Sequence, residues 1–127
     1  MNTIPLLICL FLGACATTTT TVNPQTFVCY GFDVRQCQAD TFATAVTATS
    51  AEGRSDQMKD WLQDQGLEIG RVILIEDFYE GVCEACTICP ETFRFFVQVE
   101  DDATPAEMDI QRLELFNLEE VDCEEFF

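Results

Sequence analysis

The cysteines restrict what this chain can fold into more than any other feature of its sequence. Eight are present, and six of them follow residue 25. These six are Cys29, Cys37, Cys83, Cys86, Cys89 and Cys123. The middle three of the six, at gaps of two residues, lie between two strongly apolar segments. Such a set can cross-link the chain, bind a metal or exchange electrons, and the compartment of the protein favours one of these roles.

The first residues of the chain have the composition of an export signal. Residues 4–16 form an apolar run of about a dozen residues, too short to span a bilayer and of the length of a signal-peptide core. The run contains Leu12-Gly13-Ala14-Cys15, which resembles the lipobox of bacterial lipoprotein precursors. In that family the cysteine becomes the first residue of the mature protein and carries the lipid. The resemblance therefore implies lipidation of Cys15.

The sequence divides into three segments on this interpretation. Residues 1–14 are a signal peptide, residues 15–25 a tether with five consecutive threonines, and residues 26–127 a single small domain. The protein would lie in the bacterial cell envelope, attached to the membrane through its N-terminal lipid and facing the periplasm or the exterior. The alternative is ordinary secretory cleavage after Ala16, because residues 14–16 also have the small-x-small pattern; this would release a soluble secreted protein.

The charge and the absence of histidine exclude several functions. Acidic residues outnumber basic ones by 23 to 6, which gives a net charge of −17. Such a chain repels nucleic acid and anionic surfaces, so we expect no nucleic-acid partner. Histidine, the commonest general base and the commonest transition-metal ligand, is absent, and no phosphate-binding loop or nucleophile motif is present. We therefore expect no enzymatic activity and no cofactor, but a binding or structural role.

Aromatic residues are the candidate contacts for a protein partner. Phe96 breaks the alternation of its segment and is predicted to cover a sheet edge or a partner surface. Tyr79 and the terminal pair Phe126 and Phe127 are further candidates.

Hydrophobic periodicity predicts the order β-α-β-β-α-β. Strands are expected over residues 40–49, 67–79, 91–100 and 118–123, and helices over residues 55–65 and 104–117. Residues 26–34 are interrupted by Gly31 and are interpreted as a short strand or an ordered lead-in. Residues 72–75, the core of the segment 67–79, are apolar at both odd and even positions, which is typical of a central strand covered on both faces. The order is that of the ferredoxin-like split βαβ fold, an α+β fold with a four-stranded antiparallel sheet and two helices on one face.

Export favours disulfides, because an even number of cysteines in a small exported domain is typical of a cross-linked framework. In the expected topology the last strand runs beside the first, which brings Cys123 close to Cys37. We therefore prefer the pairing Cys37–Cys123 among the fifteen possible, with Cys29–Cys123 next. The other cysteines could bond within their loop or each reach a different partner.

A metal-binding or thiol-redox role is the alternative. Two-residue gaps suit thiolate clusters that hold zinc, copper(I) or iron–sulfur. The candidate ligands are Cys83, Cys86, Cys89 and Cys123. Acidic residues surround the loop and disfavour the thiolate form that redox chemistry needs. The sequence thus favours disulfides over a reactive or metal-binding centre.

Overall fold

The computed structural model describes residues 24–81, 83, 85–102 and 104–127. The predicted signal peptide, the lipidation site Cys15 and the tether up to Asn23 lie outside these residues. The elements follow in the order β1 (Phe27–Arg35), η1 (Gln36–Gln38), α1 (Ala51–Asp64), β2 (Ile69–Ile75), β3 (Pro90–Glu100), α2 (Ala106–Gln111), β4 (Phe116–Val121) and α3 (Cys123–Phe126). None of the helices in this described part is long and apolar enough to cross a membrane.

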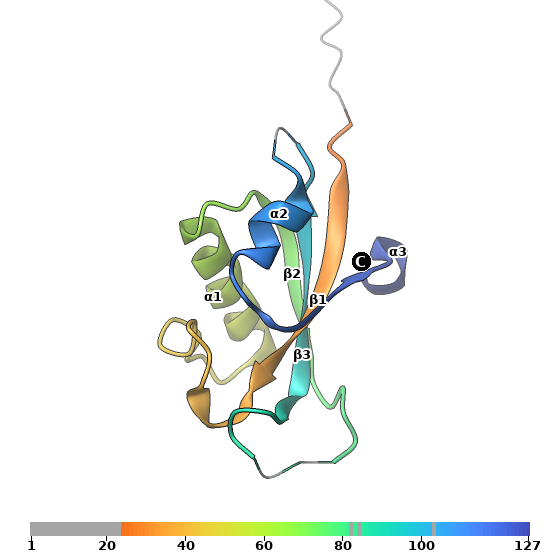
Figure 1. Ribbon diagram of the computed structural model, residues 1–127. Helices are drawn as coiled ribbons and strands as arrows, with labels where there is room; N and C mark the ends of the chain where they lie inside the picture. Colours follow the sequence, from red (N-terminus) through yellow and green to blue (C-terminus); the bar gives the residue numbers. More distant parts are fainter. Residues whose placement is uncertain (1–23, 82, 84, 103) are drawn as a thin grey trace, which may run out of the picture.

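The four strands form one antiparallel sheet in the order β2-β3-β1-β4. Figure 1 shows α1 and α2 on one side of the sheet and the short α3 on the other. This arrangement is the split βαβ topology, so the predicted α+β, ferredoxin-like fold class is confirmed. Two strand predictions were wrong. The first strand is β1 rather than residues 40–49, and β2 is an edge strand rather than a central one.

The main hydrophobic core lies between the sheet and the helices α1 and α2. Phe32 of β1 and Phe95 of β3 are fully buried there, with their ring centroids 5.6 Å apart. Met58 and Leu62 of α1 and Ile110 of α2 cover them and are also fully buried. Because burying a side chain of this size stabilises the fold by about 1.5–3 kcal/mol, these contacts fix how the helices sit on the sheet.

Gly31 lies in the middle of β1 and does not interrupt it. A Cβ atom at this position would lie 2.9 Å from Nε of Arg94 and 2.9 Å from the ring of Phe96, both on the neighbouring strand β3. Glycine is therefore needed because two large side chains cross over the backbone of β1 here.

Residues 41–45 form turns and the rest of the segment 40–49 is irregular, although its alternating pattern predicted a strand. Phe42 enters the core, where it packs edge-on against Trp61 at a centroid distance of 5.5 Å. The backbone N–H groups of Thr47 and Ala48 both donate to Oε1 of Gln57 in α1, at 2.8 Å each. Because β1 occupies the position beside β3 and β4, the backbone of this segment is satisfied by a helix side chain instead of a neighbouring strand.

The helix starts also differ from the prediction. Ser50 caps α1, because its Oγ accepts a hydrogen bond from the backbone N–H of Gly53. The predicted cap, Ser55, lies inside the helix and donates to a backbone carbonyl. Thr104 was predicted to cap α2. Instead, Oδ1 of Asp101 accepts a hydrogen bond from the backbone N–H of Ala106 at 3.1 Å.

Three disulfides cross-link the domain. They are Cys29–Cys123, Cys37–Cys86 and Cys83–Cys89. The preferred pairing Cys37–Cys123 was wrong, and the second choice, Cys29–Cys123, is present. The reason is the identity of the first strand: Cys29 lies in β1 opposite Val121 of β4, while Cys37 lies beyond the other end of β1.

Candidate functional site

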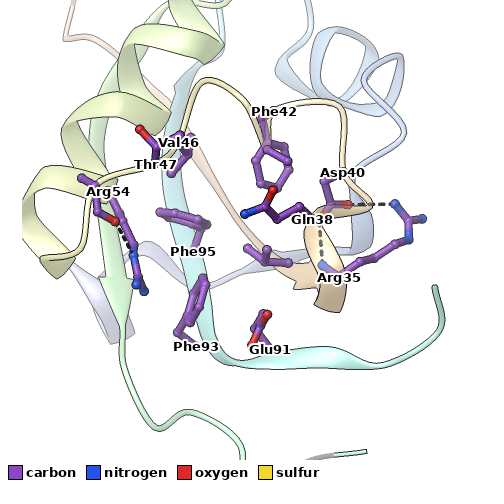
Figure 2. A pocket seen from close by; sticks show the side chains of 13 residues that line it. Arg35, Gln38, Asp40, Phe42, Val46, Thr47, Arg54, Glu91, Phe93 and Phe95 are labelled. Carbon is purple, nitrogen blue, oxygen red and sulfur yellow. Dashed lines mark hydrogen bonds and ion pairs between the residues drawn. The ribbon is translucent and has the colours of Figure 1, made fainter. Parts of the chain in front are cut away.

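A cleft of about 340 Å³ opens at the end of the sheet where β1 finishes and β3 begins (Figure 2). The end of β1, the segment of residues 40–48, the start of α1 and the start of β3 enclose it. Its floor is apolar, formed mainly by Phe42, Phe93 and Phe95. Phe42 and Phe95 are almost completely buried, and Phe93 meets Phe95 edge-on at a centroid distance of 6.2 Å. The volume of the cleft lies within the range of small-molecule sites, and its lining mixes apolar with polar and charged residues.

Arg54 is the cation on one side of the cleft. Its Nε donates to the backbone carbonyl of Ala48 at 2.9 Å, and its guanidinium lies 4.7 Å from the centroid of the Phe93 ring. Among the described residues no carboxylate lies within 4.0 Å of this guanidinium. Glu76 and Asp77 line an adjoining hollow but form no ion pair with it. The guanidinium is therefore held in place by the chain without being neutralised.

Local structure explains how Arg54 is positioned. The irregular segment of residues 46–49 is attached to α1 through Gln57, so the carbonyl of Ala48 is fixed relative to the helix. Gly53 allows this close packing, because a Cβ atom there would lie 2.9 Å from the side chains of Ala48 and Ser50.

The opposite side of the cleft carries no free charge. Nη1 of Arg35 donates to Oδ1 of the buried Asp40 at 2.8 Å, and Oδ2 of Asp40 accepts from the backbone N–H of Arg35. Figure 2 shows this pair on one side of the cleft and Gln38 extending between it and Phe95. Glu91 lies at the edge of the cleft from β3. Within the described part of the chain, the cleft thus combines one unpaired cation, one neutralised pair and one carboxylate.

A second polar cluster lies on the opposite face of the sheet, around Asp33. This carboxylate is fully buried and accepts hydrogen bonds from the Tyr79 hydroxyl at 2.8 Å, from Nη1 of Arg94 at 3.1 Å and from Nδ2 of Asn117 at 2.7 Å. Arg94, itself 4% exposed, also donates to the carboxylate of Glu119 at 2.8 Å. The cluster ties the segment after β2 and the start of β4 to the centre of the sheet.

The hydrogen bonds of this cluster join separate segments of the chain. Burial and the hydrogen bond to Asp33 raise the pKa of Tyr79 above its ordinary value of 10.0. Nε of Arg94 is buried with no hydrogen-bond partner, but it is covered by the sheet and aromatic rings rather than facing a cavity. The proton on Tyr79 is therefore held in place, and the Asp33 carboxylate at the centre of the cluster is closed off from solvent.

Of the aromatic candidates for a partner surface, Phe96 is buried, while Tyr79, Phe126 and Phe127 are half-buried. Phe96 is 1% exposed and stacks on Phe126 of α3 at a centroid distance of 3.9 Å. Phe127 accepts a hydrogen bond at its carbonyl oxygen from Arg71, whose guanidinium lies over the Phe127 ring. Phe96 was expected to cover a sheet edge or a partner surface; in the structure it is covered by α3 of the same chain.

The three-cysteine loop is cross-linked. Cys83 and Cys89 bond with each other, and Cys86 bonds with Cys37 of η1. The alternative ligand set does not gather, because Cys123 is bonded to Cys29 in β1. In the described part of the chain no group of three or more potential ligands is arranged to hold a metal ion.

Sequence reasoning missed the cleft. The alternation in β3 placed Phe93 and Phe95 on one face, as observed, but nothing nearby indicated that Arg54 would meet them. The available signal was weak: an arginine in the first turns of an amphipathic helix, in a chain with only six basic residues.

Fold and site together define a small, disulfide-bonded α+β domain with a partly apolar cleft at one end of its sheet. No protein-family model, no curated protein and no solved structure matches the chain. Any functional proposal has to rest on the chemistry of its own residues.

Proposed function

We propose that the protein is exported, anchored in a bacterial cell envelope by a lipid on Cys15, and that its domain has a non-enzymatic binding or structural role. The pairing of all six cysteines beyond residue 25 into disulfides carries this proposal. Two of these bonds join positions 94 and 49 residues apart, so they constrain the whole domain rather than one loop. Such bonds persist in exported proteins and are rare in reducing compartments.

The lipid anchor is supported by the sequence on both sides of Cys15. The apolar run and the lipobox-like motif precede the cysteine, and the threonine-rich segment comes after it. A tether over residues 15–25 spans at most about 40 Å when fully extended. The chain enters the domain at the start of β1, and the cleft lies at the other end of this strand, beside Arg35. The cleft would therefore be at the end of the domain away from the point of attachment.

The anchor is tested by metabolic labelling of the full chain with a fatty-acid analogue in a bacterial host. We expect the protein to be labelled, the label to be lost in Cys15→Ala, and Cys9→Ala to keep it, because Cys9 lies within the predicted signal core. Label retained by Cys15→Ala, or an unlabelled mature protein found only in the medium, would refute the anchor.

Thiol counting separates this function from the metal-binding or redox alternative. The protein is purified from an oxidising compartment, unfolded without reductant and treated with a thiol reagent and, in parallel, with a chelator. We expect no reactive thiol among the six cysteines of the domain. Three or four thiols that react only after chelation would replace the disulfide framework with a metal site.

A further inference from the structure

We propose that the cleft beside Arg54 binds a small monocarboxylate with an aromatic or branched aliphatic body. This inference names a ligand class for the binding role proposed above and therefore rests on that role.

The size and floor of the cleft define the body of the ligand. A cavity of about 150 Å³ lined by apolar side chains holds one benzene molecule. The cleft, at about 340 Å³, has room for a ring of that size and a short chain carrying a polar group. The half-buried ring of Phe93 can contact the face or edge of a second aromatic ring, and Phe42 and Phe95 support it from beneath, almost completely buried.

Arg54 defines the polar group. A guanidinium presents a planar set of donors that match the two oxygens of a carboxylate. Here the plane is fixed in advance, because Nε is bonded to the Ala48 carbonyl and the guanidinium lies over the Phe93 ring. Its Nη groups donate no hydrogen bond to another described residue. Glu76 and Asp77 line the adjoining hollow without pairing with Arg54, so among the described residues no carboxylate occupies the place that an external carboxylate would take.

The remaining charges limit the ligand to one carboxylate. On the far side of the cleft Arg35 is already neutralised by Asp40, so it does not offer a second anion site. Glu91 lies at the edge of the cleft, where it would repel a second negative group. A dicarboxylate of similar length should therefore bind more weakly than a monocarboxylate.

The test is an NMR titration of backbone amides in the full, disulfide-bonded chain, with phenylbutyrate as probe. Phenylbutanol is the matched probe, because it has the same body but no charge. Arg54→Gln removes the guanidinium, and Arg54→Lys keeps the charge but not the fork. The control variant is Arg112→Gln, which changes the net charge equally and lies at the end of α2, away from the cleft.

We expect saturable shifts at cleft residues with a Kd on the order of 1 mM, from the ligand efficiency usual for about twelve non-hydrogen atoms. Arg54→Gln should weaken binding by at least about tenfold, and phenylbutanol should bind correspondingly more weakly. Arg54→Lys should lie in between, while Arg112→Gln should stay within about twofold of the unchanged chain. Each variant's amide spectrum shows whether the fold is intact.

Three results would overturn the proposal: no saturable shift at the cleft, equal binding of phenylbutanol, or equal effects of the Arg54 and Arg112 variants. The outcome is separate from that of the anchor. Fatty-acid labelling without probe binding would remove only the cleft proposal, and probe binding without labelling would remove only the anchor.

Discussion

The buried ion pair of Asp33 and Arg94 gives the most direct test of what holds together the face of the sheet opposite α1 and α2. The carboxylate lies in β1 and the guanidinium in β3, 3.1 Å apart, and both are almost completely buried. Tyr79 and Asn117 complete the contacts of the carboxylate from two further segments. Asp33→Ala removes the acceptor that all three partners share.

The magnitude depends on the groups that lose their partner. Arg94 would keep Glu119 as its carboxylate partner, but that side chain is 62% exposed and cannot replace a buried counter-charge. The Tyr79 hydroxyl and the Asn117 amide would lose their acceptor as well. Removing one member of a buried ion pair costs about 3–5 kcal/mol, and each orphaned polar group up to about 1–3 kcal/mol where it cannot reach water. We expect the free energy of unfolding to fall by about 3–5 kcal/mol.

The assay is guanidinium unfolding with the disulfides intact, followed by the fluorescence of Trp61, the single tryptophan. The matched control is Asp60→Ala on the exposed side of α1, which should change the free energy of unfolding by no more than about 0.5 kcal/mol. A cost below about 1 kcal/mol for Asp33→Ala would refute the reasoning, because it would mean that the pair is effectively solvated.

A double-mutant cycle identifies the pair as the cause. Arg94→Met alone leaves the Asp33 carboxylate buried without its cation, so it should also be strongly destabilising. The double variant Asp33→Ala with Arg94→Met removes both charges, and its cost should fall short of the sum of the single costs by at least about 2 kcal/mol. Additive costs would assign the effect to lost packing instead of the charges.

Three further predictions concern stability. Replacing both Cys29 and Cys123 by serine should lower the free energy of unfolding by about 4–5 kcal/mol, because the bond closes a loop of 94 residues. Replacing both Cys83 and Cys89, which are only six residues apart, should lower it by about 2 kcal/mol. Denaturant unfolding compares the two variants, and equal losses would contradict the loop-entropy argument. Burial and the nearby carboxylate of Glu120 raise the pKa of Tyr30 from 10.0 to about 12, so its contribution to stability is complete below pH 10 and is lost as the pH rises through 12. Ultraviolet titration should show no tyrosinate from Tyr30 at pH 10 in the folded chain and ionisation near pH 10 after unfolding; ionisation near pH 10 in the folded chain would count against this. Gly31→Ala should cost about 1–3 kcal/mol in the same unfolding assay, because its Cβ atom would lie 2.9 Å from the Arg94 side chain, and a neutral effect would mean that the guanidinium moves freely.

The fold class could be predicted from the sequence because most of its information is local. The β-branched segment of β2, the alternation of β3 and the helical spacing of Met58 and Leu62 each identify an element from neighbouring residues alone. The first strand was misassigned because Gly31 was taken as an interruption of the strand. The glycine is needed there to make room for Arg94, which lies far along the chain in β3 and could not be inferred from neighbouring residues. A periodic pattern cannot show whether a place in the sheet is already taken, so residues 40–49 were predicted as a strand that the structure replaces with turns and irregular backbone.

The disulfide prediction failed for the same reason and not for a separate one. The first and last strands were expected to lie side by side, and β1 and β4 do pair. With residues 40–49 as the first strand, Cys37 was the cysteine expected to lie nearest to Cys123. With β1 as the first strand, the cysteine nearest to Cys123 is Cys29. The cleft could not be predicted from the sequence, because the position of Arg54 depends on a contact outside its own helix. Its Nε donates to the carbonyl of Ala48, and the segment of residues 46–49 is itself held against α1 by hydrogen bonds to Gln57.

The three-cysteine loop has a role in the cleft even though its cysteines are cross-linked. Cys37 and Gln38 both adopt left-handed backbone conformations, with φ of 60° and 55°, which cost about 1–3 kcal/mol each in residues other than glycine. The bond from Cys37 to Cys86 closes a loop of 49 residues and stabilises the fold by about 4 kcal/mol, which is comparable to this strain. Gln36 adds two hydrogen bonds, one from its backbone N–H to the carbonyl of Cys89 just before β3 and one from its side chain to the carbonyl of Pro90, the first residue of β3. Because Gln38 lines the cleft, the loop acts as the support that keeps this wall of the cleft in an otherwise unfavourable conformation.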